Sequence, residues 1–432
     1  MKPLFLLLFT FLSLQIHSQD LYFPPTSGNT WETLPPEALN WCPEKIDLLN
    51  NFLEDNNTKA FILLKDGKIV IESYFDDHTM ATPWYWASAG KTITGFMTGI
   101  AQQEGFLSID EPTATYLGTG WTSCLPGEEL AITIENQLAM TSGLDDGVPD
   151  PTCTTSNCLE CLASPGTRWA YHNAPYTLLD QVIEEATATS LNNYTTQKLK
   201  TPTGMTGTFL PVENNNVFFS NARSMARFGL LMLNNGNWDG NQIMTDTNYF
   251  NQMVTSSQSL NEAYGYLWWL NGTETFMLPG LQTVFNGPLF NNAPEDTYAA
   301  MGKDGQFLNV VPSENLVWIR MGEDPSNLPV PFLLNDQIWT FINDLDCELN
   351  TIEISKQSIQ ITPNPASNFI SVKATDEIKK IDVFTAHGQL IESQTVNENE
   401  FTLNLTSYAT GMYFINVYYT NGKRTVRQIV KE

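Results

Sequence analysis

Strand-forming segments occur at two distant places in this chain, at residues 61–74 and in three later runs at 298–302, 306–311 and 316–321. The first place has two apolar runs around Asp66-Gly67, a dipeptide typical of hairpin turns. We expect the three later runs to pair as neighbouring antiparallel strands. A sheet built from both places requires the chain between them to form an insertion. The sequence therefore predicts an α+β fold in which one antiparallel sheet is completed late in the chain.

Helical periodicity accounts for most of the rest of this body. Pro43 opens a segment whose apolar residues recur at helical spacing, and a last helix is expected near 331–345. Further helices are expected near 88–103, 135–140, 175–186, 192–200 and 222–234. This order describes an antiparallel sheet flanked by terminal helices, with a helical lobe inserted between its halves.

The character of the chain changes at about Ile361, where helical periodicity disappears. Alternating apolar and polar runs, separated by Gly and Asn turns, predict a small all-β sandwich at 359–432 after a linker at 350–358. Residues 356–432 hold eight Lys/Arg and seven Asp/Glu, a net charge of +1. The total net charge of the chain is −26, so residues 1–355 carry a net charge of −27. Such an acidic body argues against nucleic acid and anionic membranes as partners.

The N-terminus predicts export. Residues 1–18 are typical of a signal peptide and too short to span a membrane, and no later apolar stretch reaches spanning length. We expect an exported, soluble main domain at 19–349. Six cysteines in an exported chain favour disulfides. Cys153, Cys158 and Cys161 are spaced closely enough for zinc, but the chain has only four histidines, so we expect no metal and no cofactor.

One predicted helix start carries a candidate nucleophile. Ser88 and Lys91 stand three residues apart, and positions i and i+3 share a helix face. A lysine amine beside a serine hydroxyl can take its proton, and a helix N-terminus offers backbone N–H groups to an oxyanion. The same spacing also fits an ordinary capped helix with a solvated lysine. The pair therefore needs support from elsewhere in the chain.

Two later segments offer that support. Tyr171 and Asn173 stand two residues apart in a loop that leads into a helix, so both polar tips can point into one cleft. Gly302-Lys-Asp-Gly305 precedes an apolar strand that begins at Gln306. A cation and a glycine at that point would let a substrate approach the strand edge, although by itself the segment is an ordinary charged turn.

Together these segments resemble the serine β-lactamase and penicillin-binding-protein family, especially the class C β-lactamases and their esterase-like relatives. The resemblance covers about residues 40–345 and includes Thr141-Ser-Gly-Leu144, the segment 219–230 and Tyr264-Gly-Tyr-Leu-Trp-Trp269. It implies the β-lactamase-like fold and hydrolysis through an acyl-enzyme. In that family's scheme Ser88 is the acylated nucleophile and Lys91 its activating base. Tyr171 carries the proton to the leaving group, and Asn173 orients Lys91 and the substrate amide.

The resemblance further implies that residues 303–305 bind substrate, because Lys303, Asp304 and Gly305 stand at the family's Lys-Thr-Gly strand motif. The backbone N–H groups of Ser88 and Gln306 would form the oxyanion hole. The chain departs from the pattern at Asp304, where the family has Thr or Ser. A carboxylate there would repel the carboxylate of an antibiotic and could pair with Lys303. We therefore expect neutral or cationic esters or amides to be preferred to β-lactams.

The C-terminal module resembles the sorting domain of the type nine secretion system of gliding and related Gram-negative bacteria. The resemblance rests on Ile361-Thr-Pro-Asn-Pro365, Gly411-Met-Tyr-Phe-Ile415 and the basic ending at 422–431. It implies passage through the periplasm, recognition by the outer-membrane secretion machinery and removal of the module. The mature protein is then expected outside the cell or at its surface.

Aromatic residues flank the predicted cleft: Trp84, Trp86, Trp169, Trp268 and Trp269. They either pack beneath the cleft or line an apolar acyl pocket. His172 lies between two site residues in sequence, and we expect it to point away from them.

The leading hypothesis is a secreted serine hydrolase that acts on a small-molecule, short peptide or ester substrate. A β-lactamase or D-amino-acid peptidase of the same fold is one alternative. A catalytically silent surface binding protein is the other.

The expected architecture also predicts a disulfide. Cys42 directly precedes the first helix and Cys347 directly follows the last, and these helices should lie side by side against the sheet. We expect these two residues to pair. Three pairings stay open for the remaining cysteines, Cys124, Cys153, Cys158 and Cys161.

Overall fold

The computed structural model describes residues 21–324, 330–347, 359–386, 388–420 and 424–432. The signal peptide expected at 1–18 and the linker expected at 350–358 lie outside the described residues. The chain forms two compact units, Met1–Cys347 and Glu348–Glu432, each with its own hydrophobic core.

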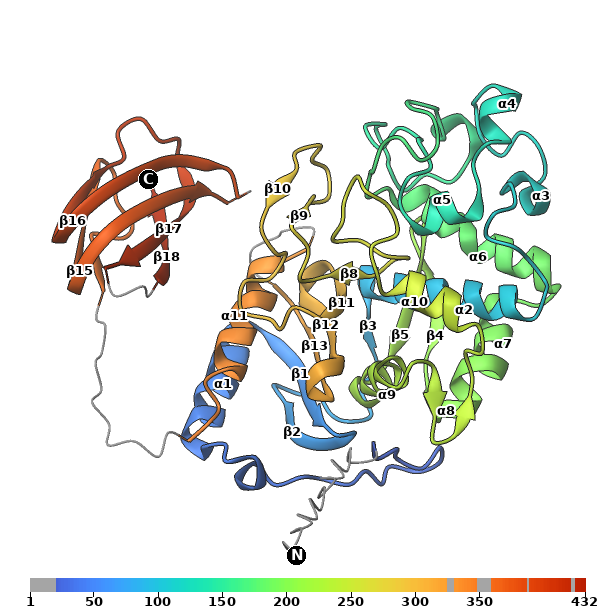
Figure 1. The fold of residues 1–432 in the computed structure, drawn as a ribbon, viewed down its shortest axis with the longest axis horizontal. Coiled ribbons are helices and arrows are strands. Elements are labelled where there is room, and N and C mark those ends of the chain that lie inside the picture. The colour runs from blue at the N-terminus through green and yellow to red at the C-terminus, as the bar shows by residue number, and fades with distance from the viewer. Residues whose placement is uncertain (1–20, 325–329, 348–358, 387, 421–423) are drawn as a thin grey trace, which may run out of the picture. The chain divides into compact units, whose positions relative to one another are not determined.

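The larger unit is built on a six-stranded antiparallel sheet with the order β2-β1-β13-β12-β11-β8 (Figure 1). The strands are β1 (Thr58–Lys65), β2 (Lys68–Tyr74), β8 (Trp269–Leu270), β11 (Tyr298–Gly302), β12 (Gln306–Val311) and β13 (Leu316–Gly322). Strand β1 of the early hairpin pairs with β13, so the sheet joins the two distant segments as predicted. Asp66 and Gly67 have φ values of 52° and 79°, the left-handed turn that Asp-Gly favours.

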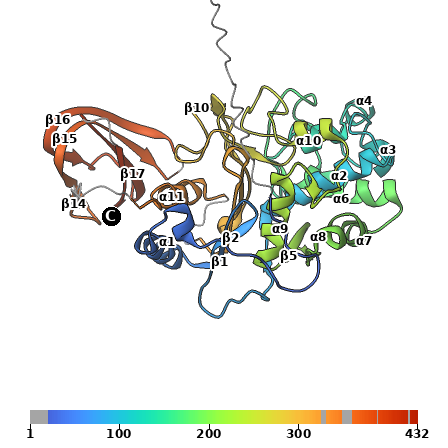
Figure 2. The same ribbon diagram turned by 60° about the horizontal axis from the view of Figure 1, so that its bottom comes forward.

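Two helices, α1 (Pro43–Asp55) and α11 (Phe332–Ile342), lie side by side against one face of this sheet (Figures 1 and 2). The rings of Phe52 and Phe341 stack between them with their centroids 4.5 Å apart. Cys42 and Cys347 form a disulfide just outside the two helices, with 5.0 Å between their Cα atoms. The predicted pairing of these two residues is confirmed.

The other face of the sheet is covered by α9 (Ala222–Leu233), which packs on β1, β12 and β13. The Asn221 side chain caps this helix by accepting a hydrogen bond from the Ser224 backbone N–H. At Gly229 a Cβ would lie 2.5 Å from the side chains of Leu308 and Val317. This glycine therefore lets the helix lie close to the sheet.

A helical lobe is inserted between β2 and β11, as the sequence predicts. Its helices are α2 (Lys91–Gln103), α3 (Ala114–Leu117), α4 (Pro126–Glu129), α5 (Ile134–Leu138), α6 (Asn173–Thr187), α7 (Leu191–Thr195), α8 (Thr201–Thr203) and α10 (Thr247–Met253). Its strands are β3 (Trp84–Tyr85), β4 (Thr208–Val212), β5 (Asn215–Ser220), β6 (Asn237–Trp238), β7 (Asn241–Gln242), β9 (Thr275–Phe276) and β10 (Phe285–Asn286). Helix α2 is buried from Lys91 to Ala101, so it forms the centre of the lobe. The helix expected at 192–200 is interrupted, because α7 passes into a π-helical turn at Thr196–Lys200.

Two further disulfides secure the long loops of the lobe. Cys124 pairs with Cys161, and Cys153 pairs with Cys158. All six cysteines are therefore in disulfides. This selects one of the three pairings that the sequence left open.

The smaller unit is an all-β module whose strands form one curled sheet (Figure 1). Strands β14, β15, β17 and β18 follow one another in the sheet, and β16 pairs with β15. Their bounds are β14 (Gln360–Thr362), β15 (Phe369–Thr385), β16 (Leu390–Asn404), β17 (Gly411–Tyr419) and β18 (Arg424–Lys431). Alternate residues of β17 are buried, which is the pattern of a strand with one face on a core.

Candidate active site

Ser88 lies in a 3-10 turn, η2 (Ala87–Gly90), that connects β3 to α2. The sequence placed the start of the helix at Ser88, but the α-helix begins three residues later at Lys91. Ala87 has a φ of +47°, a left-handed conformation that is uncommon for a residue with a Cβ. Non-glycine residues in this conformation are concentrated at functional sites, where the surrounding structure holds them.

Trp86 anchors this turn to the neighbouring strand β5. Its backbone N–H donates to the Phe218 carbonyl oxygen at 2.8 Å, and its indole Nε1 donates to Ser220 Oγ at 2.8 Å. The indole is fully buried and packs edge-on against the Phe218 ring. These contacts with β5 therefore hold in place the backbone that carries Ser88.

Lys91 lies beside Ser88, with its Nζ donating to Ser88 Oγ at 2.8 Å. The side chain is only 3 % exposed. Its Nζ lies 4.2 Å from the centroid of the Tyr176 ring and 5.1 Å from that of Tyr171. Burial lowers the pKa of Lys91 to about 7, although the nearby charge of Asp180 acts to raise it. The lysine can therefore lose its proton near neutral pH.

Tyr171 precedes α6 and completes this cluster. Its ring stacks on Trp269 with centroids 5.6 Å apart and also contacts Trp169. Burial raises the pKa of Tyr171 far above neutral, and a hydrogen bond with Ser88 partly offsets this effect. The phenol therefore keeps its proton at neutral pH while it lies within reach of the serine.

Asn173 is the first residue of α6, and we expect its side chain to orient Lys91 and the substrate amide. Its Oδ1 is buried and has no hydrogen-bond partner among the described residues, so it accepts no hydrogen bond from Lys91 there. An unsatisfied buried acceptor is costly, so it is well suited to a donor supplied by a ligand. The intervening His172 is buried, and burial lowers its pKa to about 4.

Gly302, at the end of β11, touches the backbone of Ser88. A Cβ at this position would lie 3.0 Å from the Ser88 nitrogen and 2.6 Å from the Trp86 carbonyl oxygen. We expected Gly305 to provide the close approach at this edge of the sheet. Instead, Gly305 has a φ of +76°, and a Cβ on it would meet the guanidinium of the buried Arg320. The glycine that the site requires is therefore Gly302.

The strand register indicates which backbone amide faces the site. In an antiparallel sheet, alternate residues direct both N–H and C=O to the same side of the strand. The Thr297 carbonyl oxygen accepts from the Asn271 N–H on the β8 side, so the odd-numbered residues of β11 face that side. Strand β8 pairs only with residues 298 and 299, which leaves the edge open further along. Gly302 is extended, so the Lys303 N–H points toward this open edge.

Gln306 begins β12 as expected, but its backbone N–H points in a different direction from the one expected. It pairs with Gly302 in the β11–β12 ladder, so its backbone N–H faces β11 and not the open edge. Its buried side chain is also committed, because Oε1 accepts from the Gly322 N–H at 3.0 Å and Nε2 donates to the Gly322 carbonyl oxygen at 2.7 Å. The expected oxyanion donor at Gln306 is therefore wrong on geometric grounds, and the Lys303 N–H fits that role.

The sequence allows an ion pair between Asp304 and Lys303, but the Asp304 carboxylate has a different partner. The Asp304 Oδ2 accepts from the Tyr85 hydroxyl at 2.6 Å, and no ion pair between the two neighbours occurs in the described structure. Asp304 has a φ of +61°, and the buried Arg320 donates to its carbonyl oxygen at 3.1 Å. The carboxylate is therefore held in a rigid turn, while the Lys303 side chain is exposed.

The tryptophans expected near the cleft mostly pack beneath it. Four of them are buried to 1 % exposure or less: Trp86, Trp169, Trp268 and Trp269. Trp84 is only partly buried. Trp269 supports the Tyr171 ring directly, so this cluster positions catalytic candidates rather than forming an empty pocket.

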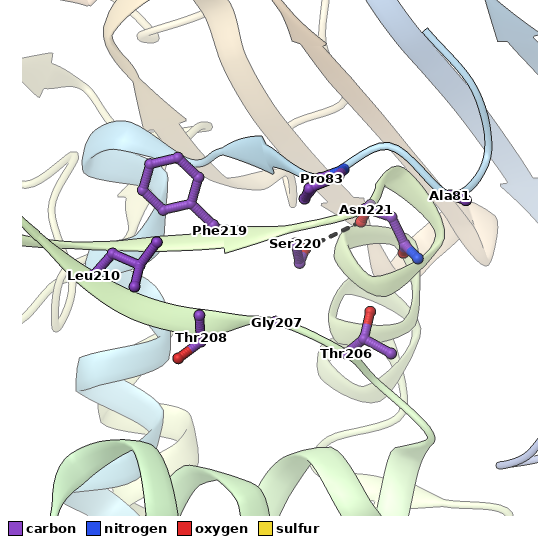
Figure 3. A pocket seen from close by; sticks show the side chains of 9 residues that line it. All are labelled: Ala81, Pro83, Thr206, Gly207, Thr208, Leu210, Phe219, Ser220 and Asn221. Atoms are coloured by element: carbon purple, nitrogen blue, oxygen red, sulfur yellow. Dashed lines mark hydrogen bonds between the residues drawn. The ribbon is translucent and has the colours of Figure 1, made fainter.

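A separate groove of about 400 Å³ runs along the β4–β5 hairpin (Figure 3). Its lining includes Pro83, Leu210, Phe219 and Ser220, but none of Ser88, Lys91 or Tyr171. The Ser220 hydroxyl is already engaged, because it donates to the Asn221 carbonyl oxygen and accepts from an indole N–H. Among the residues that the structure describes, no group of three or more His, Cys, Asp or Glu side chains is placed to hold a metal ion.

Two family models match the chain. The model of the Beta-lactamase family matches residues 53–339, and that of the secretion system C-terminal sorting domain matches residues 360–432. The second match indicates type IX secretion to the cell surface or the extracellular space and implies the secretion machinery as a partner. None of the helices in the described ranges is long and apolar enough to cross a membrane.

Individual relatives are distant. An uncharacterised protein of Alkalihalophilus pseudofirmus is 24 % identical over 308 residues, which are 62 % of this chain and 84 % of that protein. Protein flp of Staphylococcus aureus is 26 % identical over 176 residues, which are 36 % of this chain and 35 % of its own length. The matched part of this chain thus spans about a third of that protein.

Solved structures share the fold at low identity. A penicillin-binding protein homologue from Caulobacter crescentus is 13 % identical with a TM-score of 0.55, covering 70 % of this chain and 98 % of its own. A family VIII carboxylesterase is also 13 % identical with a TM-score of 0.55, covering 73 % of this chain and 99 % of its own. This likeness concerns the fold alone.

Proposed function

This chain belongs to the Beta-lactamase family, which groups β-lactamase-like and penicillin-binding-protein-like serine hydrolases, and we propose that it cleaves esters or amides through an acyl-enzyme on Ser88. The observation that carries the proposal is the 2.8 Å hydrogen bond between Lys91 Nζ and Ser88 Oγ in a buried setting. A solvated lysine at a helix start would be exposed and would keep its proton. Here burial lowers the pKa of Lys91 to about 7, which suits a general base.

In the proposed acylation step, Ser88 Oγ attacks the substrate carbonyl carbon and its proton passes to Lys91 Nζ. The electron pair of the carbonyl moves onto its oxygen. The backbone N–H groups of Ser88 and Lys303 stabilise that oxyanion from two elements, the η2 turn and the open edge of β11. The contact of Gly302 with the Ser88 backbone supports this assignment, since it brings the two elements together.

In the second half of the step, the leaving group needs a proton. Tyr171 is protonated at neutral pH and near both Ser88 and Lys91, so it can pass its proton to the departing oxygen or nitrogen and take back the proton that Lys91 received from Ser88. The unpartnered Oδ1 of Asn173 is suited to accept an N–H of an amide substrate. Water then hydrolyses the acyl-enzyme, with the same groups acting in reverse.

For the substrate class, we propose neutral or cationic esters or amides. The Asp304 carboxylate is fixed by Tyr85, which itself precedes Ser88 by three residues. Because it lies one residue from the proposed oxyanion donor Lys303, it disfavours substrates with a carboxylate at that point. Penicillins and cephalosporins carry such a carboxylate. For this reason we place a β-lactamase or a D-amino-acid peptidase second among the candidate functions.

A fluorescent fluorophosphonate and a fluorescent penicillin distinguish these candidates and the silent binding protein. The proposal predicts fast labelling by the fluorophosphonate, slow labelling by the penicillin, and no labelling of Ser88→Ala. Fast labelling by the penicillin would favour the second candidate. Absence of labelling by either probe would favour a silent binding protein and overturn the proposed function.

A further inference from the structure

Asp180 is a buried carboxylate that the proposed mechanism does not yet use. It lies on α6 and is only 7 % exposed. Its Oδ1 accepts from Thr94 Oγ1 on α2 at 3.0 Å, and its Oδ2 accepts from Asn216 Nδ2 on β5 at 3.1 Å. Three separate elements therefore hold this one carboxylate. Burying such a group is costly, so a structure that retains it calls for an explanation.

A packed path connects Asp180 to Lys91. Thr94 follows Lys91 by one turn of α2, and Tyr176 precedes Asp180 by one turn of α6. The centroid of the Tyr176 ring lies 4.2 Å from Lys91 Nζ, and its hydroxyl lies near enough to Thr94 for the two groups to interact. Thr94 thus contacts both the carboxylate and the tyrosine that covers the lysine. The lysine and the carboxylate occupy one buried cluster between α2 and α6.

In this cluster, Asp180 supplies the negative charge that can balance a positive charge on Lys91. The titratable groups that face Lys91 are the Ser88 hydroxyl and the phenols of Tyr171 and Tyr176, and burial keeps both phenols neutral. Tyr264, whose pKa is also raised by burial, adjoins the two tyrosines. On α6, the exposed Glu184 acts on Asp180 from one turn further along.

Burial disfavours the charged forms of Lys91 and Asp180, whereas their mutual attraction favours these forms. Burial lowers the pKa of Lys91 to about 7 and raises that of Asp180 to about 7. The charge of each partner favours the charged form of the other, and the hydrogen bonds from Asn216 and Thr94 favour the carboxylate. The negative charge of Asp180 therefore makes Lys91 a stronger base than burial alone would leave it.

We propose that Asp180 is a positioning residue that provides the buried negative charge for the ammonium formed when Lys91 takes the Ser88 proton. The inference rests on the proposed function. During acylation the proton leaves Ser88 Oγ as that oxygen bonds to the carbonyl carbon, and Lys91 becomes positive in a buried site. Without the carboxylate this charge would be buried and unpaired. A buried aspartate serves histidine in the same way in Ser-His-Asp enzymes.

The test is the rate of fluorophosphonate acylation as a function of pH, compared between wild type and Asp180→Asn. Asparagine keeps the shape and can still bond to Thr94 and Asn216, because the Asn216 amide can turn over. The charge alone is lost. We expect the rate above neutral pH to fall at least about tenfold. The midpoint of the acid limb should move down by roughly one pH unit, because Lys91 then loses its proton more easily.

A matched pair at Thr94 provides a second measurement. Thr94→Val removes a hydrogen bond that favours the carboxylate, so the acylation rate near pH 7 should fall and recover at higher pH. Thr94→Ser keeps the hydroxyl and should restore the profile relative to Thr94→Val. Glu185→Gln, on the exposed side of the same helix, is the charge control and should leave the profile unchanged.

Each result decides the matter. An Asp180→Asn enzyme that is slower but keeps the wild-type acid limb would show a purely structural role and overturn the inference. If that variant does not fold, identical pH profiles for Thr94→Val and Thr94→Ser would overturn it. Failure of the wild-type protein to be labelled at Ser88 would instead overturn the proposed function.

Discussion

Gly302 lies directly against the backbone of Ser88, and a Cβ at this position would come within 3.0 Å of the Ser88 nitrogen. The contact joins the end of β11 to the turn that carries the proposed nucleophile. Because both sides of the contact are backbone, neither can yield as a flexible side chain would. The distance between the two proposed oxyanion donors, Ser88 N–H and Lys303 N–H, therefore depends on the absence of a side chain at residue 302.

Gly302→Ala should disable the enzyme while leaving the fold in place. The added methyl group would push β11 away from Ser88, and a misplacement of about 1 Å can cost about a hundredfold in rate. The measurement is kcat/KM on a short nitrophenyl ester, with circular dichroism as the check on folding. Gly127→Ala is the control, since nothing lies within 4 Å of a Cβ at that exposed position. Equal activity of the two variants would refute the geometric account.

Lys91 should set the acid limb of the pH profile. Burial lowers its pKa to about 7, and only the neutral amine can accept the Ser88 proton, so activity should rise with pH through a midpoint near 7. Lys91→Ala should lose about 10²–10⁴-fold in kcat/KM, the usual contribution of a general base. Tyr171→Phe should also lose orders of magnitude. A profile that is flat between pH 5 and 9 would be inconsistent with this base.

Asp304 should control the choice between esters and β-lactams. Wild-type enzyme should hydrolyse neutral nitrophenyl esters far better than penicillins or cephalosporins. Asp304→Asn removes the charge, tolerates the left-handed backbone and can still accept from Tyr85, so it should shift the ratio toward β-lactams by about tenfold, or about 1.4 kcal/mol. Asp304→Thr should shift it in the same direction, with added strain from the β-branched side chain at a φ of +61°. A wild-type preference for cephalosporins would contradict this interpretation.

The disulfide between Cys42 and Cys347 should stabilise the larger unit. It spans a sequence separation of 305 residues, for which the chain-entropy model gives an upper value of about 5–6 kcal/mol. The double variant Cys42→Ser/Cys347→Ser should unfold at a clearly lower temperature in calorimetry yet remain active. The matched control is Cys153→Ser/Cys158→Ser, whose bridge spans only 5 residues and should matter less. A larger loss from the control pair would contradict the loop-length argument.

Much of the fold could be predicted from local sequence because its signals are local. The periodicity after Pro43 and the Asp66-Gly67 turn each involve a few neighbouring residues, and both predictions are confirmed. The pairing of Cys42 with Cys347 followed once the two terminal helices were placed side by side. These features depend on propensity and order, which a sequence displays directly.

The finer geometry of the site depends on register and on distant contacts, which a sequence does not display. The sequence assigned the oxyanion donor to Gln306. The direction of the Gln306 backbone N–H depends on which residue of β11 pairs with Gln306, and the sequence does not show that register. Which of the two glycines the site requires depends on the neighbour that a Cβ would meet. That neighbour is the Ser88 backbone at Gly302 and Arg320 at Gly305. Asp180 carried no signal, because its partners come from α2 and β5. The left-handed Ala87 was equally invisible.

The proposed function requires that Ser88 becomes covalently acylated, and mass spectrometry of the protein during turnover of a nitrophenyl ester can detect this acyl group. The enzyme should be quenched in acid within the first turnovers and digested. We predict a mass increase equal to the acyl group on the peptide that contains Ser88, absent from Ser88→Ala, which should also have lost turnover. Rapid hydrolysis with no acyl group on that peptide, or a Ser88→Ala protein that hydrolyses the ester at nearly the wild-type rate, would contradict it.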